Sequence, residues 1–157
     1  MGWSITIAAI SIVCGLSLFG YLPNSNDVCL EIFASQLTAC PVPTDCLVLE
    51  HHKLLGKLNG NGNGIDFASV LLLQTRLDMT ADELLEYYSS FNFRPAKHSM
   101  YKVDIIVEAV EEESFRNEYI EHISLSFESK MNHDEYNYYA VRIFDGPYNT
   151  GLDLRGN

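Results

Sequence analysis

Hydrophobic and polar positions change their period near residue 100, which predicts two kinds of structure along the chain. Before this point, apolar residues recur at three- to four-residue intervals, the spacing of helices that bury one side. After it, apolar and polar residues alternate, the spacing of strands that bury one face. We therefore expect an α+β domain in which several short helices pack on an antiparallel sheet.

The clearest helix signal covers residues 81–90, where Thr80 and Glu83 have the spacing of a capping box. The same period predicts two further helices, over residues 28–39 and 45–58. Residues 66–77 allow either another helix or a buried strand over residues 69–73, because periodicity alone does not separate these for a short apolar run.

Three alternating stretches predict strands joined in an antiparallel meander, over residues 100–110, 122–130 and 136–144. The sequence Asn-His-Asp-Glu, residues 132–135, predicts the turn between the last two strands. One face of this sheet is expected to meet the helices and the other to meet water.

Residues 3–22 are uncharged and mostly apolar, which predicts a transmembrane helix ahead of the three-stranded β-meander and its helices. At about 1.5 Å per residue, this stretch matches the roughly 30 Å hydrocarbon core of a bilayer. A cleaved secretory signal is the alternative, but no Lys or Arg precedes the apolar core and the cleavage site is poor. We expect residues 1–25 to form a transmembrane anchor or uncleaved signal, and residues 26–157 to form an extracytoplasmic α+β domain.

The expected location is therefore a membrane crossed once, with the domain on the periplasmic or extracellular side. Only the terminal amine at Met1 favours keeping the short end inside, because the nearest basic side chain is Lys53. If the apolar segment is cleaved, the domain is secreted instead.

The chain is acidic, with 10 Lys and Arg residues against 21 Asp and Glu residues and a net charge of −11. Binding to nucleic acid rests on Lys and Arg contacts to phosphates, so the charge argues against a nucleic-acid partner. A basic protein would be attracted instead. The sequence thus favours a protein partner, together with the membrane contacted by residues 3–22.

Three cysteines lie outside the apolar segment, and an oxidising compartment would permit one disulfide among them. Cys29 and Cys40 would lie about 16 Å apart along a helix, whereas a bridge needs Cα atoms within roughly 7 Å. Cys40 and Cys46 flank a short Pro-containing turn, so we expect a Cys40–Cys46 disulfide, with Cys29 free or paired with another chain. Three reduced, buried thiols are the alternative.

The run of three Asn-Gly pairs, residues 59–64, lacks the residues of a ligand-binding loop. Counted from Asn59, a calcium loop would need Glu at its twelfth position, where Val70 stands. A phosphate-binding P-loop would need Ser or Thr after Gly56-Lys57, where Leu58 stands. We interpret the run as a flexible joint or turn.

Two other groups suggest chemistry without the required spacing. Adjacent His51 and His52 would point about 100° apart on a helix and so would not share a metal ion easily. On the predicted middle strand, every second residue is polar: His122, Ser124, Ser126 and Glu128. Neighbours in this set would lie about 6.6–6.8 Å apart, which is too far for a hydrogen bond between a nucleophile and a base. We expect no catalytic, cofactor-binding or metal-binding residues, and we infer no small-molecule ligand.

A docking surface is the functional feature that the sequence favours most. Acid clusters speed the encounter with a basic partner, and tyrosines supply contact area at low entropic cost. The predicted partner-binding residues are Glu111, Glu112, Glu113, Tyr136, Tyr138 and Tyr148. A solvated connection between strands would show the same acidic run.

These features favour a small, membrane-anchored, extracytoplasmic binding protein, for example an immunity- or inhibitor-type protein acting on a basic partner. An accessory structural subunit of a membrane complex is the first alternative, since small residues in the apolar segment allow close helix contact. A secreted enzyme of unknown type is the second.

Overall fold

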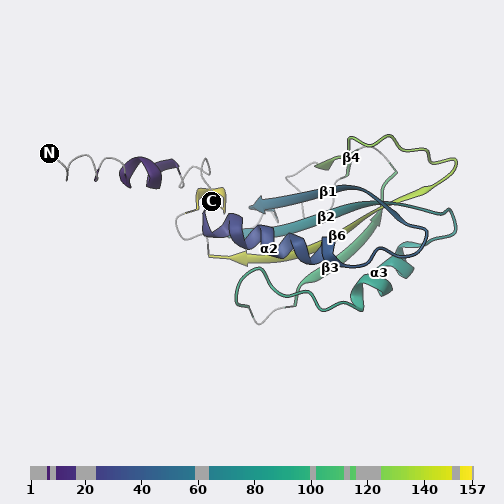
Figure 1. Cartoon of the computed structure of the whole chain (residues 1–157), viewed down its shortest axis with the longest axis horizontal. Helices are drawn as coiled ribbons and strands as arrows, with labels where there is room; N and C mark the ends of the chain where they lie inside the picture. The colour runs from purple at the N-terminus through teal and green to yellow at the C-terminus, as the bar shows by residue number, and fades with distance from the viewer. Residues whose placement is uncertain are drawn as a thin grey trace.

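The computed structural model describes residues 7, 10–16, 24–58, 64–99, 102–111, 114–115, 125–149 and 153–156. Figure 1 shows an elongated domain whose long strands run roughly along its long axis. In chain order the elements are α2 (Ser25–Ala39), β1 (Leu47–Gly56), β2 (Ile65–Thr75), α3 (Ala81–Ser89), β3 (Asp104–Ala109), β4 (Ser114–Phe115), β5 (Leu125–Ser126), β6 (Asn137–Tyr148) and η2 (Leu154–Gly156). The α+β class is confirmed.

Four strands form one antiparallel sheet in the order β1-β2-β6-β3. β2 pairs with β1 on one side and with β6 on the other, and β3 pairs with the remaining edge of β6. The last long strand of the chain therefore lies inside the sheet, between two strands that precede it.

The predicted three-stranded meander differs from this arrangement. The described part of the predicted middle strand contributes only β5, which pairs with β4 in a separate two-stranded sheet. Its alternation is real, because Leu125 and Phe127 are buried while Ser126 and Glu128 are exposed. The two buried side chains pack in the apolar cluster on the sheet's second face, so this segment covers the sheet and does not extend it.

The helix predicted over residues 45–58 is wrong, because this segment forms β1. For residues 66–77 the strand interpretation is confirmed, since they contain most of β2. Ten of the eleven β2 residues are buried, and Gln74 is the exception. A buried strand needs hydrogen-bonding partners on both edges, and β1 supplies one of them.

Both faces of the sheet are covered. α2 and α3 pack on one face and form the larger core, in which Phe33, Leu37, Leu84 and Tyr88 contact β2 and β6. Residues 125–131 supply side chains to a second cluster on the opposite face, around β2 and β6. The expectation of one wet face is therefore wrong for the two central strands, because the apolar side chains of residues 65–73 and 138–144 are at most 7% exposed.

The predicted helices at residues 28–39 and 81–90 are confirmed as α2 and α3. α3 has the expected capping box, in which the Thr80 side chain accepts from Glu83 N and the Glu83 side chain accepts from Thr80 N. Asn24 caps α2 in the same way with Asp27. Two capping boxes thus fix where both helices begin.

The C-terminal residues fasten the beginning of α2. The buried Asp153 carboxylate accepts hydrogen bonds from Asn24 Nδ2 (3.1 Å) and Asn26 Nδ2 (2.9 Å) and pairs with Arg155 Nη2 (2.6 Å). Arg155 Nη1 also pairs with Asp27 (2.6 Å). Burial alone would raise the pKa of Asp153, but hydrogen bonds from Arg155, Asn26 and Asn24 outweigh it and hold this pKa well below its usual range. We call Asn24, Asn26, Asp27, Asp153 and Arg155 the C-terminal clasp.

The domain has two distinct ends. The clasp lies at the end where α2 begins, and the N-terminal segment must join here because it precedes Asn24; we call it the anchor end (left in Figure 1). At the far end β2 and β3 finish while β6 and α3 begin. With 12 residues in β6, the two ends are separated by about 40 Å.

Among the described residues, no helix combines the length and the apolar character needed to cross a membrane. Of the predicted span, residues 3–22, the structure describes residue 7 and residues 10–16, which are helical. The rest of that prediction falls outside the described residues.

Candidate functional site

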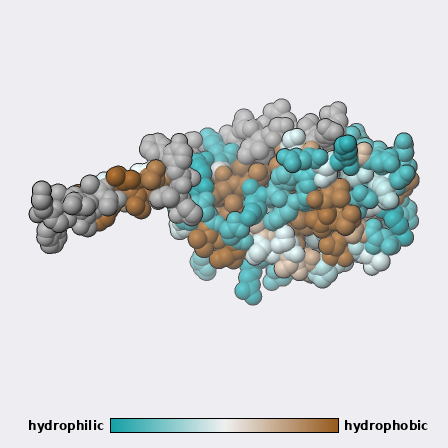
Figure 2. Space-filling model, turned by 45° about the horizontal axis from the view of Figure 1, so that its top comes forward, coloured by the Kyte–Doolittle hydropathy of each residue, from teal (hydrophilic) through white to brown (hydrophobic). Residues whose placement is uncertain are grey.

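The far end exposes apolar side chains at the ends of three neighbouring strands. Leu47 begins β1 and is 57% exposed, Leu77 follows β2 and is 55% exposed, and Tyr136 precedes β6 and is 36% exposed. Adjacent strands lie about 4.8 Å apart, so the ends of β1 and β6 lie about 10 Å apart on either side of β2. We call Leu47, Leu77 and Tyr136 the apolar tip. Figure 2 shows a hydrophobic patch bordered by hydrophilic residues in the half of the domain toward this end.

Hydrogen bonds hold the backbone of the far end in place. Asn137 Nδ2 donates to Leu77 O (3.0 Å), and the Tyr139 hydroxyl donates to Met79 O (2.8 Å). Val110 N donates to Tyr138 O (2.8 Å), which continues the pairing of β3 with β6 by one residue. The turn after β2 and the chain after β3 are thus tied to the beginning of β6.

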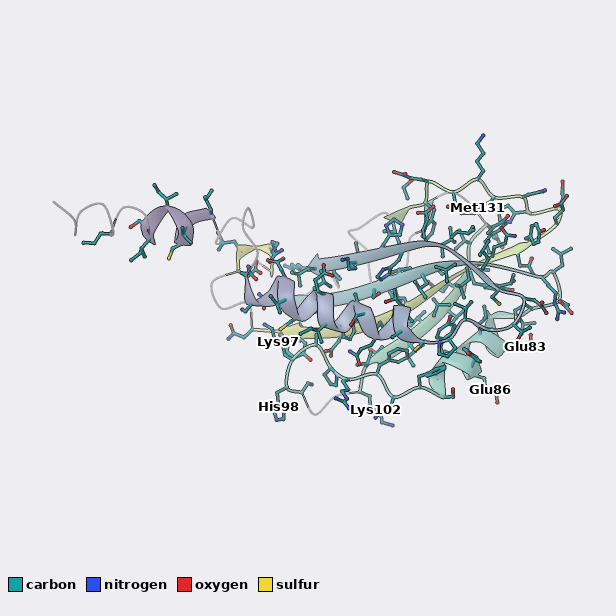
Figure 3. The ribbon with its side chains drawn as sticks, viewed as in Figure 1. Glu83, Glu86, Lys97, His98, Lys102 and Met131 are labelled. Carbon is teal, nitrogen blue, oxygen red and sulfur yellow. The ribbon has the colours of Figure 1, made fainter. Side chains whose placement is uncertain are left out.

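Acidic side chains are frequent in the segments next to the apolar tip. Those that are exposed in the segments adjoining it, which we call the acidic rim, are Asp78, Asp82, Glu83, Glu111, Asp134 and Glu135. The neighbouring cation Arg76 is already paired with Asp45 (3.2 Å) and Asp78 (3.1 Å). Figure 3 shows Glu83 on the far-end half of α3, on the outer side of the helix. The far end therefore carries excess negative charge.

This arrangement matches the anatomy of a protein-binding surface. Interfaces commonly have an apolar centre with large side chains and a polar or charged rim. Clustered exposed apolar residues on a small domain are typical of an interaction site, whereas isolated ones are ordinary. An acidic rim steers a basic partner toward the centre and disfavours an acidic one.

The structure separates the residues predicted to form the docking surface. Glu111 and Tyr136 lie at the far end and are exposed. Tyr138 is close to them in sequence but only 3% exposed, with its hydroxyl accepting from Asn132 N (2.7 Å). Tyr148 lies at the anchor end of β6. Glu112 and Glu113 fall outside the described residues.

Sequence reasoning missed the apolar members of the tip. Leu47 falls in the segment 45–58, for which the sequence predicts a helix, and Leu77 ends the segment 66–77, for which it allows a helix or a strand. Only the pairing of β1 with β2 shows that both lie at strand ends. No local pattern of the sequence carries that information.

The histidines of β1 form polar pairs on opposite faces of the sheet. His51 Nε2 is 2.8 Å from Ser69 Oγ, a serine with no exposed surface. A buried hydroxyl offers no access to a substrate, so this Ser–His pair is structural. Burial, helped by Lys53 and His52, lowers the pKa of His51.

On the other face, His52 Nε2 lies 2.8 Å from Glu50 Oε2, and Ser129 N donates to Glu50 Oε1 (2.5 Å). Burial would raise the pKa of Glu50, but these hydrogen bonds outweigh it and lower the pKa. The His52 ring also contacts Phe127 edge-on, with 5.5 Å between centroids. These contacts fix the segment that covers the second face.

Other candidate chemistry finds no assembled site in the described part of the chain. The described residues include no group of three or more His, Cys, Asp or Glu side chains arranged to hold a metal ion. Of the polar set on the predicted middle strand, Ser126 and Glu128 are exposed, and His122 and Ser124 fall outside the described residues.

The four cysteines are free thiols in the structure. Cys40 and Cys46 are half-buried against the helix-side core, and burial raises the pKa of both thiols. Both also act electrostatically on the buried hydroxyl of Tyr88. The Cys40–Cys46 disulfide stays a prediction for an oxidising compartment.

Comparison with known proteins assigns no relative. No protein-family model, no curated protein and no solved structure matches the chain.

Proposed function

We propose that the chain is a non-catalytic binding protein, held at a membrane by its apolar N-terminal segment, whose far end captures a basic protein. The observation that carries this proposal is the apolar tip inside its acidic rim, at the end opposite the anchor. An immunity- or inhibitor-type role, in which capture blocks the partner, is the concrete form of the proposal.

The position of the tip supports this function. The N-terminal segment joins at the anchor end, and about 40 Å of sheet separates that end from the tip. A partner approaching from the aqueous side would therefore meet the tip before the rest of the domain. The acidic rim would attract a basic partner over roughly one Debye length, about 8 Å at physiological salt.

The proposal divides the work of binding between two kinds of residue. Tyr136 and Leu77 would fill pockets on the partner and carry most of the affinity, because buried aromatic and apolar anchors dominate interfaces. Glu111, Asp134 and Glu135 would mainly raise the association rate, because rim charges act on encounter.

The test is affinity capture of the full chain from detergent-solubilised source membranes, with bound proteins quantified by mass spectrometry. Tyr136→Ala should reduce capture of a specific basic protein about thirtyfold, the loss expected for an interface anchor. Ile32→Ser removes an apolar side chain that is more exposed than Tyr136 (63% against 36%) from α2, outside the tip, and should leave capture unchanged.

A second pair of variants tests the charges. Asp134→Asn with Glu135→Gln should slow association and weaken its salt dependence, whereas Glu128→Gln, on the segment covering the second face, should not. Capture that is equal for Tyr136→Ala and Ile32→Ser would contradict the proposed site.

A second candidate function, an accessory subunit of a membrane complex, is favoured by α2. Val28 and Ile32 are 56% and 63% exposed and lie one turn apart on its outer side, at the helix half nearer the anchor end. Removing residues 1–23, which keeps the Asn24 cap, separates the two functions. A tip-binding protein would still capture its partner, whereas an accessory subunit would lose assembly.

A further inference from the structure

A pocket of about 440 Å³ lies beside the loop that joins α3 to β3. Its lining contains apolar residues, among them Phe93, Val103 and Ile105. It also contains polar residues, among them Asn92, Ser99 and Lys102. The size falls within the range of small-ligand sites, and the lining offers both apolar contact and polar groups to a bound molecule.

The loop beside the pocket is fixed from two elements. Gln36 of α2 clamps Arg94 twice, donating from Nε2 to Arg94 O (2.9 Å) and accepting from Arg94 N (2.7 Å). Asp145 of β6 accepts from Ala96 N (2.6 Å) and from the Tyr148 hydroxyl (2.5 Å). A loop held this way presents a preformed site and loses little conformational freedom when a ligand binds.

The charge of this loop is opposite to that of the protein. The sequence between Glu86 and Asp104 contains no acidic residue, yet it contains three of the ten Lys and Arg residues, Arg94, Lys97 and Lys102, together with His98. Figure 3 shows Lys97, His98 and Lys102 on one side of the domain, with Glu83 and Glu86 farther toward the far end. In a chain of net charge −11, such a segment forms a local attraction for anions.

Three features set the charge of the loop and of the pocket beside it. Lys97 Nζ stands 5.6 Å from the Phe67 ring centre and 5.7 Å from that of Tyr148, so two rings hold the ammonium. Lys102 itself lines the pocket. Asp104 is the first residue of β3, and the next residue, Ile105, also lines the pocket. Because successive side chains of a strand point to opposite faces, the Asp104 carboxylate is directed away from the pocket.

We propose that this pocket binds a phosphate group attached to an apolar or aromatic body. Lys102 would pair with the phosphate as a point charge, Asn92 and Ser99 would supply polar contacts, and Phe93 and Val103 would contact the apolar part. The site differs from the expectation that the chain takes no small ligand. It is independent of the tip, so either proposal can fail without the other.

Such a phosphate has two sources, a soluble metabolite or the headgroup of an anionic lipid. The loop allows both, because Lys97 contacts Phe67 and Tyr148, which lie toward the anchor end of β2 and β6. The first experiment tests whether the pocket binds a phosphate group, and the second identifies whether that group comes from a metabolite or from a lipid.

The test uses the full ¹⁵N-labelled chain in zwitterionic detergent micelles, titrated with phenyl phosphate and separately with inorganic phosphate. We expect saturable amide shifts within residues 89–99 and 102–105, with phenyl phosphate binding more tightly because its ring contacts the apolar wall. Lys102→Ala should weaken phenyl phosphate binding about tenfold. Lys130→Ala, a matched change of an exposed lysine on the segment covering the second face, should not.

The absence of saturable shifts in these amides, or equal affinity of Lys102→Ala and the unmodified chain, would overturn the proposal. The source is then decided in nanodiscs. Shifts of the same amides with phosphatidylglycerol but not phosphatidylcholine, lost in Lys102→Ala, identify a lipid headgroup. Shifts that need added phenyl phosphate in both lipids identify a soluble ligand.

Discussion

The C-terminal clasp should contribute a large part of the stability of the domain, and Asp153→Asn tests this. The Asp153 carboxylate accepts from two asparagine side chains and from Arg155 Nε (2.9 Å) and Nη2 (2.6 Å) while almost fully buried. The asparagine side chain has the same shape but carries no charge. One of its two terminal groups is an NH₂ donor, which would face the donor groups of Asn24, Asn26 and Arg155. Among the residues that the structure describes, Asp27 is then the remaining charged partner of Arg155.

The expected loss follows from these contacts. Each hydrogen bond to a charged group contributes about 1.5–3 kcal/mol, and the contributions within one network are not additive. We therefore expect Asp153→Asn to lower the free energy of unfolding by about 2–4 kcal/mol. Domains of this size are stable by about 5–15 kcal/mol, so the change is readily measured.

The assay is urea unfolding of the full chain in neutral micelles, followed by far-ultraviolet circular dichroism. Urea is preferred to guanidinium because it leaves ion pairs unscreened. Asp134→Asn is the matched control, since Asp134 is exposed on the turn before β6, and it should change stability by less than about 0.5 kcal/mol.

The pH dependence supplies the refutation. The folded protein holds the pKa of Asp153 below its unfolded value of about 3.9, so its stabilisation is present above that value. The stabilisation is lost as the pH falls through the folded pKa, so the difference between the original chain and Asp153→Asn should shrink below about pH 4. Equal urea midpoints at pH 7, or a difference that does not change between pH 7 and pH 2.5, would refute the role given to the clasp.

Three further changes test the fold by the same unfolding measurement. Leu72→Ala, at a fully buried position facing the second cluster, should lower the free energy of unfolding by about 2–5 kcal/mol, and a loss below 1 kcal/mol would show that the second face is loosely packed. Thr80→Ala removes half of the α3 capping box and should cost about 1 kcal/mol; no loss would mean that the cap does not stabilise α3. Gly146→Ala should cost more than 1 kcal/mol, because Gly146 has φ +146° and an added Cβ would overlap the Asp66 carboxylate, and a neutral result would contradict that close approach.

Local patterns predicted the features of this fold that depend on neighbouring residues. The capping box of Thr80 and Glu83 fixes the beginning of α3, and the alternation around Leu125 and Phe127 correctly separates buried from exposed side chains. Pairing of distant strands was not predictable in the same way. The segment 45–58 has apolar residues that fit a helix, and it becomes a strand because the buried β2 needs a hydrogen-bonding neighbour.

For the candidate site, too, local features were predictable from the sequence and long-range contacts were not. The acidic character and the contribution of Glu111 and Tyr136 were readable from the sequence, since charge and residue type do not depend on the fold. The separation of Tyr148 from Tyr136 depends on their positions at opposite ends of one long strand. The loop beside the pocket is held through Gln36 and Asp145, which lie 58 and 49 residues from their partners, so no local pattern shows it.

The most direct measurement of the central claim is photo-crosslinking in native membranes, with a photoreactive amino acid placed at Leu77 in the apolar tip or at Ile32 on α2. Both positions are more than half exposed, so they are equally able to react with a bound protein. We predict a crosslink from position 77 to a single basic protein, lost when Tyr136 is changed to Ala, and no such crosslink from position 32. Crosslinking of the same protein from both positions, or only from position 32, would contradict a binding site at the far end.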